Sequence, residues 1–156
     1  MEQYWQHEEF VISTEKRYLN LDLIHTFLSQ DSYWAKGVPR EVVEKAVQHS
    51  ALCFGLYRGD PRQGTVEQVG FGRVISDLAT FAYLADVFIL PSHRGLGLSK
   101  WLVRVIVEHP ELSRPRRFML ATQDAHTLYH RYGFAPLDKP GMFLQKVTKN
   151  PYGTES

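Results

Sequence analysis

VFILPSHRGLGLSKWLVRVIVEH (residues 87–109) is the stretch that decides the fold, because within it a strand pattern changes directly into a helix pattern. Its first four residues form an apolar run that favours a buried strand. The apolar residues then recur at helical spacing on one broad face: Leu98, Trp101, Leu102, Val105 and Ile106. A turn with Pro91, Arg94 and two glycines, but without an acidic residue, joins the two patterns.

This turn has the chemistry of a phosphate-binding site. A helix N-terminus carries unpaired backbone N–H groups and a partial positive charge, and glycines let a ligand approach the backbone closely. Arg94 adds a positive charge beside Gly95 and Gly97. A plain strand-to-helix turn, in which the glycines serve only chain reversal, is the other interpretation that the spacing allows.

Two common nucleotide-binding motifs are absent. A P-loop requires Gly-x-x-x-x-Gly-Lys followed by Ser or Thr, and this pattern does not occur in the sequence. A dinucleotide-binding fingerprint requires a glycine three residues after Gly97, where Lys100 stands. Both absences disfavour an unrelated nucleotide-binding protein.

The amino-acid composition limits the classes of protein to which this chain can belong. The 156 residues are 44% hydrophobic and 22% charged, which is typical of one folded domain. We expect a single domain over residues 1–149 and a frayed tail over residues 150–156. The formal net charge of +1 provides no broad field for nucleic acid, and no apolar run has the length of a membrane span. With one cysteine, Cys53, and no secretory pattern at the start, we expect a cytoplasmic protein without nucleic-acid or membrane partners.

The remaining pattern predicts an α/β (α+β) fold with a mixed, mostly antiparallel central sheet flanked by helices. Strand patterns occupy residues 10–19, 52–57, 66–75, 81–90 and 116–121. Helix patterns follow Asn20, begin near Pro39, begin at Leu98 and occupy residues 124–134. Short links between the three middle strands indicate an antiparallel meander, and the strand, helix and strand from 81 to 121 predict a parallel crossover. Two short strands, at residues 134–137 and 142–147, could finish the sheet.

Two motifs carry a resemblance to a known family. ILPSHRGLGLS (89–99) resembles the acetyl-CoA-binding motif of the GNAT superfamily of N-acetyltransferases, which runs Gln/Arg-x-x-Gly-x-Gly/Ala. Arg94 and Gly97 match this motif, and Ser99 fills its last small position. ATQDAHTLYHRYGF (121–134) resembles the second motif of the family, with Thr122 where the family often has Asn.

The resemblance implies transfer of an acetyl group from acetyl-CoA, as cosubstrate and without a metal, to the primary amine of a small molecule or peptide. It places the pantetheine arm on the backbone of a strand end and the pyrophosphate on the turn and helix start. The cofactor-binding residues that it implies are Phe88, Ile89, Leu90, Arg94, Gly95, Leu96, Gly97, Leu98, Ser99, Thr122 and Tyr129. A backbone N–H near Ile89 is the expected donor to the thioester carbonyl, and GNAT enzymes are often homodimers.

The resemblance also implies catalytic residues. Tyr129 is the candidate acid for the departing thiolate, because a phenol with a pKa near 10 is protonated at neutral pH; packing at the helix–sheet boundary is its alternative role. Asp86 is the candidate base, although some relatives place Glu at the preceding position, where this chain has Ala85. Asp86 could instead be a structural carboxylate paired with arginine, and the amine could arrive already neutral. Ala85 also keeps open a catalytically silent acyl-CoA-binding or regulatory module.

DSYWAKGVPR (31–40) is expected to line the acceptor site. Tyr33 and Trp34 could stack on an aromatic or cationic substrate next to Asp86, or Trp34 could fill the core. His126 and His130 have a spacing that can hold an ion, but no third ligand is evident, so we expect no metal site. Arg73 and Asp77 are interpreted as solvated surface residues.

Overall fold

The computed structural model describes residues 3–153 and contains one six-stranded sheet with the strand order β1-β2-β3-β4-β5-β6. The strands are β1 (Tyr4–His7), β2 (Phe10–Ser13), β3 (Leu52–Arg58), β4 (Glu67–Ser76), β5 (Phe81–Ile89) and β6 (Arg117–Leu120). Neighbouring strands pair antiparallel up to β5, and β5 and β6 pair parallel. The predicted mixed sheet, with its meander and its crossover, is therefore confirmed.

The described residues also form four α-helices: α1 (Leu21–Thr26), α2 (Arg40–His49), α3 (Leu98–Val107) and α4 (His126–His130). A π-helical turn, Phe27–Asp31, continues α1, and 3-10 turns occupy Lys16–Tyr18, Pro61–Gln63, Pro91–His93, Pro110–Leu112 and Pro140–Met142. Within residues 3–153, no helix combines the length and the apolar character that crossing a membrane requires.

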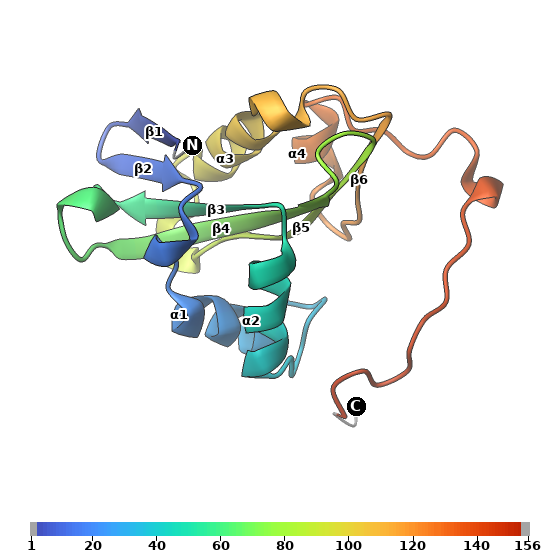
Figure 1. Cartoon of the computed structure of the whole chain (residues 1–156), viewed down its shortest axis with the longest axis horizontal. Helices are drawn as coiled ribbons and strands as arrows, with labels where there is room; N and C mark the ends of the chain where they lie inside the picture. Colours follow the sequence, from blue (N-terminus) through green and yellow to red (C-terminus); the bar gives the residue numbers. More distant parts are fainter. Residues whose placement is uncertain (1–2, 154–156) are drawn as a thin grey trace.

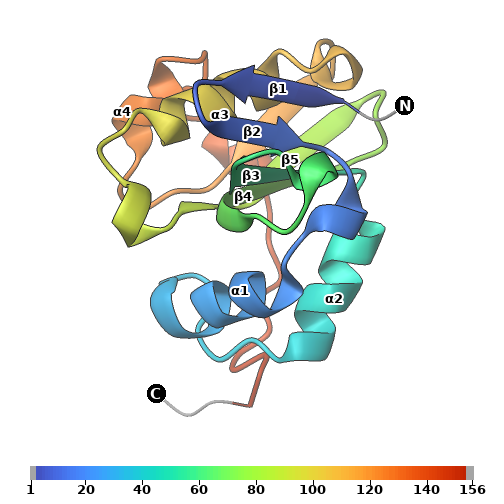
Figure 2. The same cartoon turned by 90° about the vertical axis from the view of Figure 1, so that its left-hand side faces the viewer.

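The helices form one layer on each face of the sheet. Helices α3 and α4 cover one face, and α1 and α2 cover the other (Figures 1 and 2). Strand β3 alternates accordingly, because Phe54 and Leu56 belong to the apolar cluster of α3 whereas Cys53 belongs to that of α1 and α2.

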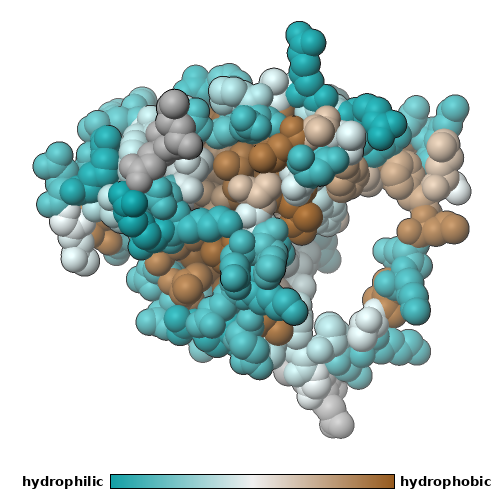
Figure 3. All heavy atoms as spheres, viewed as in Figure 1, coloured by the Kyte–Doolittle hydropathy of each residue, from teal (hydrophilic) through white to brown (hydrophobic). Residues whose placement is uncertain are grey.

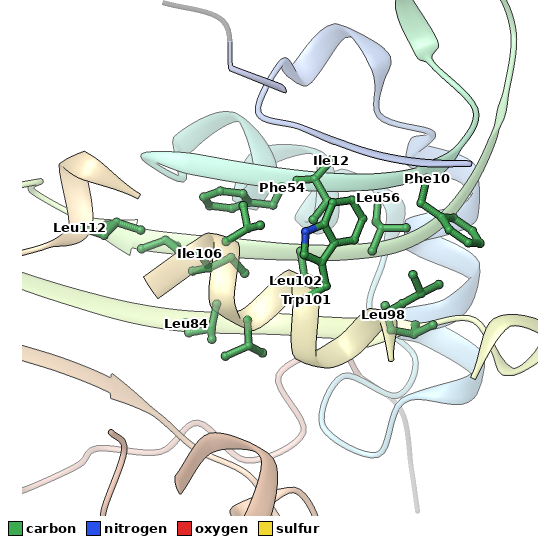
Figure 4. Packing of buried hydrophobic residues seen from close by; sticks show 14 of the residues in the cluster. Phe10, Ile12, Phe54, Leu56, Leu84, Leu98, Trp101, Leu102, Ile106 and Leu112 are labelled. Carbon is green, nitrogen blue, oxygen red and sulfur yellow. The ribbon is translucent and has the colours of Figure 1, made fainter. Parts of the chain in front are cut away.

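Helix α3 packs its apolar stripe against the centre of the sheet. Leu102 and Ile106 are completely buried, and Trp101 lies beside them over Phe54 and Leu56 (Figure 4). Full burial of each such side chain stabilises the fold by roughly 1.5–3 kcal/mol. This packing fixes the start of α3, and with it the turn that precedes the helix.

The N-terminal part of the prediction needs correction. The strand expected over residues 10–19 ends at Ser13, where the side chain accepts a hydrogen bond from Glu15 N and the chain enters a 3-10 turn. Strand β1 was missed, because its hairpin turn contains Glu8 at a positive φ of 54° instead of the usual glycine.

The short strands expected at residues 134–137 and 142–147 are also wrong for this chain by itself. Neither segment belongs to a strand in the part of the chain that the structure describes, and Met142 closes a 3-10 turn. Pro136 and Pro140 remove backbone donors there, and the chain runs away from β6 (Figure 1). Of the expected tail at residues 150–156, residues 150–153 form a turn, with Tyr152 against the cluster of α1 and α2, and residues 154–156 lie outside the described residues.

Tyr57 offers a direct test of this core. Its side chain is 1% exposed, and its hydroxyl has no hydrogen-bond partner among the described residues. A buried unpaired hydroxyl destabilises the folded state. We expect Tyr57→Phe to raise the free energy of unfolding, measured by urea denaturation, by about 1 kcal/mol. Phe54→Ala, which leaves a cavity, should lower the same quantity by about 3–5 kcal/mol. A loss of stability in Tyr57→Phe would mean that the hydroxyl is paired.

Candidate active site

A β-bulge in β5 organises the site. Asp86 and Val87 together lie opposite the single residue Gly72 of β4, because the register shifts between Phe71 and Arg73. Asp86 takes a positive φ of 56°. The extra residue reverses the alternation of β5. Before the bulge the even-numbered residues Ala82 and Leu84 face α3, whereas after it the even-numbered Phe88 faces the opposite layer, and Val87 and Ile89 face α3.

The carboxylate of Asp86 has two partners. Arg73 Nε donates to Oδ2 at 2.6 Å, and Trp34 Nε1 donates to Oδ1 at 2.7 Å. Arg73 also donates to Ser50 Oγ at 3.2 Å. The side chains of Arg73 and Asp86 are only 16% and 12% exposed, so the interpretation of Arg73 as a solvated surface residue is wrong. Asp77 is exposed, and its carboxylate accepts backbone N–H groups of the β4–β5 turn.

The pairing of β5 with β6 ends just before the bulge, and a cleft lies beside the rest of β5. Their pairing ends at Leu84 and Leu120, and β5 then continues to Ile89. The cleft has a volume of about 410 Å³ and lies between residues 87–89, the turn before α3, and α4. Strand β6 does not pair with this part of β5 in the described residues.

The glycine turn forms one end of the cleft. Arg94 Nε donates to the carbonyl oxygen of Ile89 at 3.1 Å and so ties the turn to the end of β5. Gly95 and Gly97 have φ values of 83° and 77°, which favour glycine, and a Cβ at either position would meet no atom within 4 Å. Helix α3 begins directly after Gly97 without a side-chain cap or an acidic residue in its first turn. Its first N–H groups are therefore available to an anion.

The structure brings together most of the residues that the resemblance implies. The cleft is lined by Phe88, Ile89, Arg94, Gly95, Gly97, Leu98, Ser99 and Tyr129, among others. Three expected residues do not line it. Leu96 is 60% exposed, Leu90 packs against the cluster of α1 and α2, and the Thr122 hydroxyl accepts a hydrogen bond from Ala125 N at 3.1 Å.

Tyr129 lies where the cleft meets a second, larger cavity. Its side chain is buried and packs edge-on against Phe134, and Tyr129 lines both cavities. Burial raises the pKa of Tyr129 to about 12, and the neighbouring Tyr33 and Asp124 act in the same direction. The phenol is therefore protonated at neutral pH.

The second cavity has a volume of about 700 Å³ and extends from Tyr129 toward α2. Tyr33 and Trp34 form part of its wall and make an edge-to-face pair with ring centroids 5.0 Å apart. The Tyr33 hydroxyl accepts a hydrogen bond from Gln123 N at 2.7 Å, so the α1–α2 link reaches across to the β6–α4 link. Trp34 is 42% exposed and does not fill the core.

Sequence reasoning missed Asp124, which borders both cavities. Asp124 stands within the second motif, directly before α4, but the spacing gave no reason to separate it from other surface carboxylates. Among residues 3–153 no group of three metal-ligating side chains lies together, and His126 and His130 belong to no such group. A metal-free chemistry stays a prediction.

Comparison with known proteins identifies the fold independently. Residues 49–136 match the acetyltransferase (GNAT) domain family. A crystal structure of a candidate GNAT acetyltransferase from Xanthomonas campestris pv. campestris superimposes with a TM-score of 0.85 at 48% identity, over 96% of this chain and 99% of that chain.

Curated relatives agree with this match. A candidate acetyltransferase of Gibberella zeae is 37% identical over 144 residues, which cover 81% of this chain and 79% of that protein. An uncharacterized N-acetyltransferase of Porphyra purpurea is 31% identical over 115 residues, which cover 70% of this chain and 63% of that protein. The glycine turn, the cleft beside β5 and these matches agree, and the chain belongs to the GNAT acetyltransferase family.

Proposed function

We propose that this protein is an acetyl-CoA-dependent N-acetyltransferase that acts on the primary amine of a small molecule or peptide. One observation carries the proposal: two cavities of different character meet at a protonated phenol. The cleft of about 410 Å³ ends at the glycine turn, the cavity of about 700 Å³ lies between the link 31–39 and the sheet, and Tyr129 lines both. Such an arrangement holds a donor and an acceptor on the two sides of one proton donor.

The cleft fits acetyl-CoA in its chemistry. The open space at Gly95 and Gly97 and the uncapped start of α3 suit a pyrophosphate. The strand end at Phe88 and Ile89 suits an amide-containing arm, which can pair with backbone like an added strand. Bound acetyl-CoA supplies the thioester whose acetyl group is transferred.

The residues at the junction would handle protons. A neutral amine attacks the carbonyl carbon, the carbon–sulfur bond breaks, and the amine loses one proton while the thiolate gains one. Tyr129 would protonate the sulfur. Asp86, which lines the larger cavity, would accept the proton from the amine, directly or through water, and Asp124 is the carboxylate that lines both cavities. Backbone N–H near Ile89 would polarise the carbonyl.

The acceptor side favours a cationic amine over an alcohol or a nucleic-acid base. Tyr33 and Trp34 offer aromatic rings, and Asp86 and Asp124 offer carboxylates. Because Arg73 neutralises much of the charge of Asp86, Asp124 contributes to the attraction as well. The amine would be drawn in as a cation and deprotonated in place.

Acetyl-CoA should stabilise the native protein. At 100 times the dissociation constant, binding to the folded state alone adds about 2.7 kcal/mol to the free energy of unfolding. Gly97→Trp should abolish this gain, because the indole would occupy the space above the turn. Gly64→Trp is the matched control, since Gly64 also has a positive φ and open space but lies in the β3–β4 link. Calorimetry that detects no heat when millimolar acetyl-CoA is added to the unaltered protein would refute the proposed donor.

Tyr129→Phe should lower kcat by roughly 10²–10⁴-fold and leave acetyl-CoA binding unchanged, because the ring remains while the proton is lost. Tyr132→Phe, on the turn that follows α4, is the control and should retain activity. Since the pKa of Tyr129 is about 12, against about 10 for a solvated phenol, its protonated form persists as the pH rises to 10. The pH–kcat profile should therefore show no loss from this group below pH 10. Normal turnover in Tyr129→Phe would show that Tyr129 is not the proton donor and serves only in packing.

Asp86→Asn should reduce kcat/KM by roughly 10²–10⁴-fold at neutral pH and recover in part at high pH, where the amine is already neutral. Asp124→Asn, measured with the same amine, tests the alternative carboxylate. The melting temperature of each variant must also be recorded, because Asn at position 86 weakens the contact with Arg73. If the Asp86→Asn profile matches that of the unaltered protein while that of Asp124→Asn shifts, Asp124 is the base and not Asp86.

A broad amine screen with a thiol readout for released CoA separates the two functional classes. Turnover with a primary amine supports the acetyltransferase. Acetyl-CoA binding without turnover of any amine would instead support a catalytically silent acyl-CoA-binding module, for which Ala85 at the position before Asp86 is the motivating feature.

A further inference from the structure

Helix α2 carries more apolar surface than the core of the protein uses. Val43 and Val47 are buried in the cluster of α1 and α2. Val42 and Ala46, one position earlier in each turn, do not belong to that cluster and line the larger cavity, and we call this pair the α2 wall. The side of α2 that faces the viewer is mostly hydrophilic (Figures 1 and 3). The wall is therefore a separate apolar strip that faces the cavity.

Exposed apolar side chains gather around this cavity from two elements. Val42 of the α2 wall is 38% exposed, and Tyr33 and Trp34, on the link before α2, are 48% and 42% exposed. Apolar side chains left in water together indicate a surface that a ligand or partner covers. A concave site with a mainly apolar lining and a few polar groups is typical of small-molecule binding. The larger cavity is therefore suited to a ligand with an apolar part.

The ion pair between Arg73 and Asp86 lies at one end of the α2 wall. Arg73 Nη1 donates to Ser50 Oγ, and Ser50 Oγ donates to the carbonyl oxygen of Ala46. Val42 lies one helical turn, about 5.4 Å along the axis, farther from Ser50 than Ala46 does. The wall therefore leads away from the charged groups, toward the start of α2.

We propose that the acceptor is a small primary amine with an uncharged apolar body, such as an alkyl chain, and that this body lies on the α2 wall. The inference rests on the proposed acetyl transfer, in which the amine reaches the junction of the two cavities at Tyr129. The remainder of the acceptor then extends into the larger cavity, where the side chains of Val42 and Ala46 offer no hydrogen bond. A hydroxyl or a second charge placed there would lose water without gaining a partner.

Amines of graded length test the apolar body. Ethylamine, butylamine and hexylamine share one reacting group and differ only in apolar length. A buried methylene contributes roughly 0.8 kcal/mol, so kcat/KM should rise about fourfold for each methylene in this series. The matched compound 6-aminohexanol, with a hydroxyl at its far end, should be about tenfold poorer than hexylamine. A flat series, or equal kcat/KM for hexylamine and 6-aminohexanol, would overturn the proposal.

Ala46 is the position that we expect to set the length of the acceptor. Ala46→Phe fills space beside the wall and should lower kcat/KM for hexylamine by about tenfold or more, while ethylamine keeps its value. Lys45→Phe is the matched control, because Lys45 is exposed and lines neither cavity, and both amines should keep their values. Equal losses for the two amines in Ala46→Phe would contradict this role.

Val42→Asp tests the same wall at an exposed position, where a substitution is less disruptive to the fold. The new carboxylate should lower kcat/KM for hexylamine and raise it for 1,6-diaminohexane, whose second ammonium group would reach it. Unchanged preference between these two amines would show that the acceptor does not lie on the α2 wall.

Binding measurements separate this inference from the proposed reaction. Calorimetry with hexylamine and with 6-aminohexanol measures occupation of the unaltered protein without turnover. If no amine releases CoA from acetyl-CoA, the proposed acetyltransferase fails, and tighter binding of hexylamine would still support an apolar-amine site. If amines are acetylated but hexylamine binds no more tightly than 6-aminohexanol, the acetyltransferase stands and the apolar body is wrong.

Discussion

The ion pair between Arg73 and Asp86 holds the feature on which the site depends, the bulge in β5. A positive φ at a residue other than glycine costs roughly 1–2 kcal/mol, and Asp86 offsets this with two hydrogen bonds of 2.6 and 2.7 Å. The extra residue turns Phe88 toward α1, where its ring stacks on Phe27 at 4.0 Å. It also comes just after the pairing of β5 with β6 has ended. A regular strand would keep its alternation and place different side chains at the cleft.

The parts of the fold that were predictable are those set by local pattern. A few neighbouring residues are enough to predict the apolar stripe of α3, the glycines before it and the strands of the meander. The bulge cannot be predicted in this way. Asp86 and Val87 lie opposite a single residue because of how β5 is paired with β4, and the local sequence does not contain that pairing. For the same reason Arg73 was interpreted as a surface residue: its partner is 13 positions away and is reached only after the two strands pair. The strand expected at 142–147 failed for a different reason, since a strand needs a neighbouring strand and the pattern of a segment does not supply one.

The two candidate catalytic residues have different surroundings. Tyr129 is surrounded by apolar side chains and nearby Tyr33 and Asp124, and all of these favour the neutral phenol. Asp86 lies between a guanidinium and an indole N–H, and each donates a hydrogen bond to one of its carboxylate oxygens. The proton donor and the proton acceptor that we propose are therefore held by different kinds of contact. The sequence predicted these two residues through family motifs, whereas the environment that separates their roles comes from packing between distant segments.

The donor and acceptor sides that we propose for the site are built from different kinds of structure. The donor side consists of a strand end and a helix start, both fixed by the buried stripe of α3. The proposed acceptor side includes a link between helices that is held at the larger cavity by two hydrogen bonds, from Gln123 N to Tyr33 and from Trp34 to Asp86. Links of this kind tolerate substitution better than packed elements. If the two sides hold the substrates that we propose, a change in the link should alter the choice of acceptor without disturbing donor binding, provided that the contact with Asp86 and the bulge in β5 are kept.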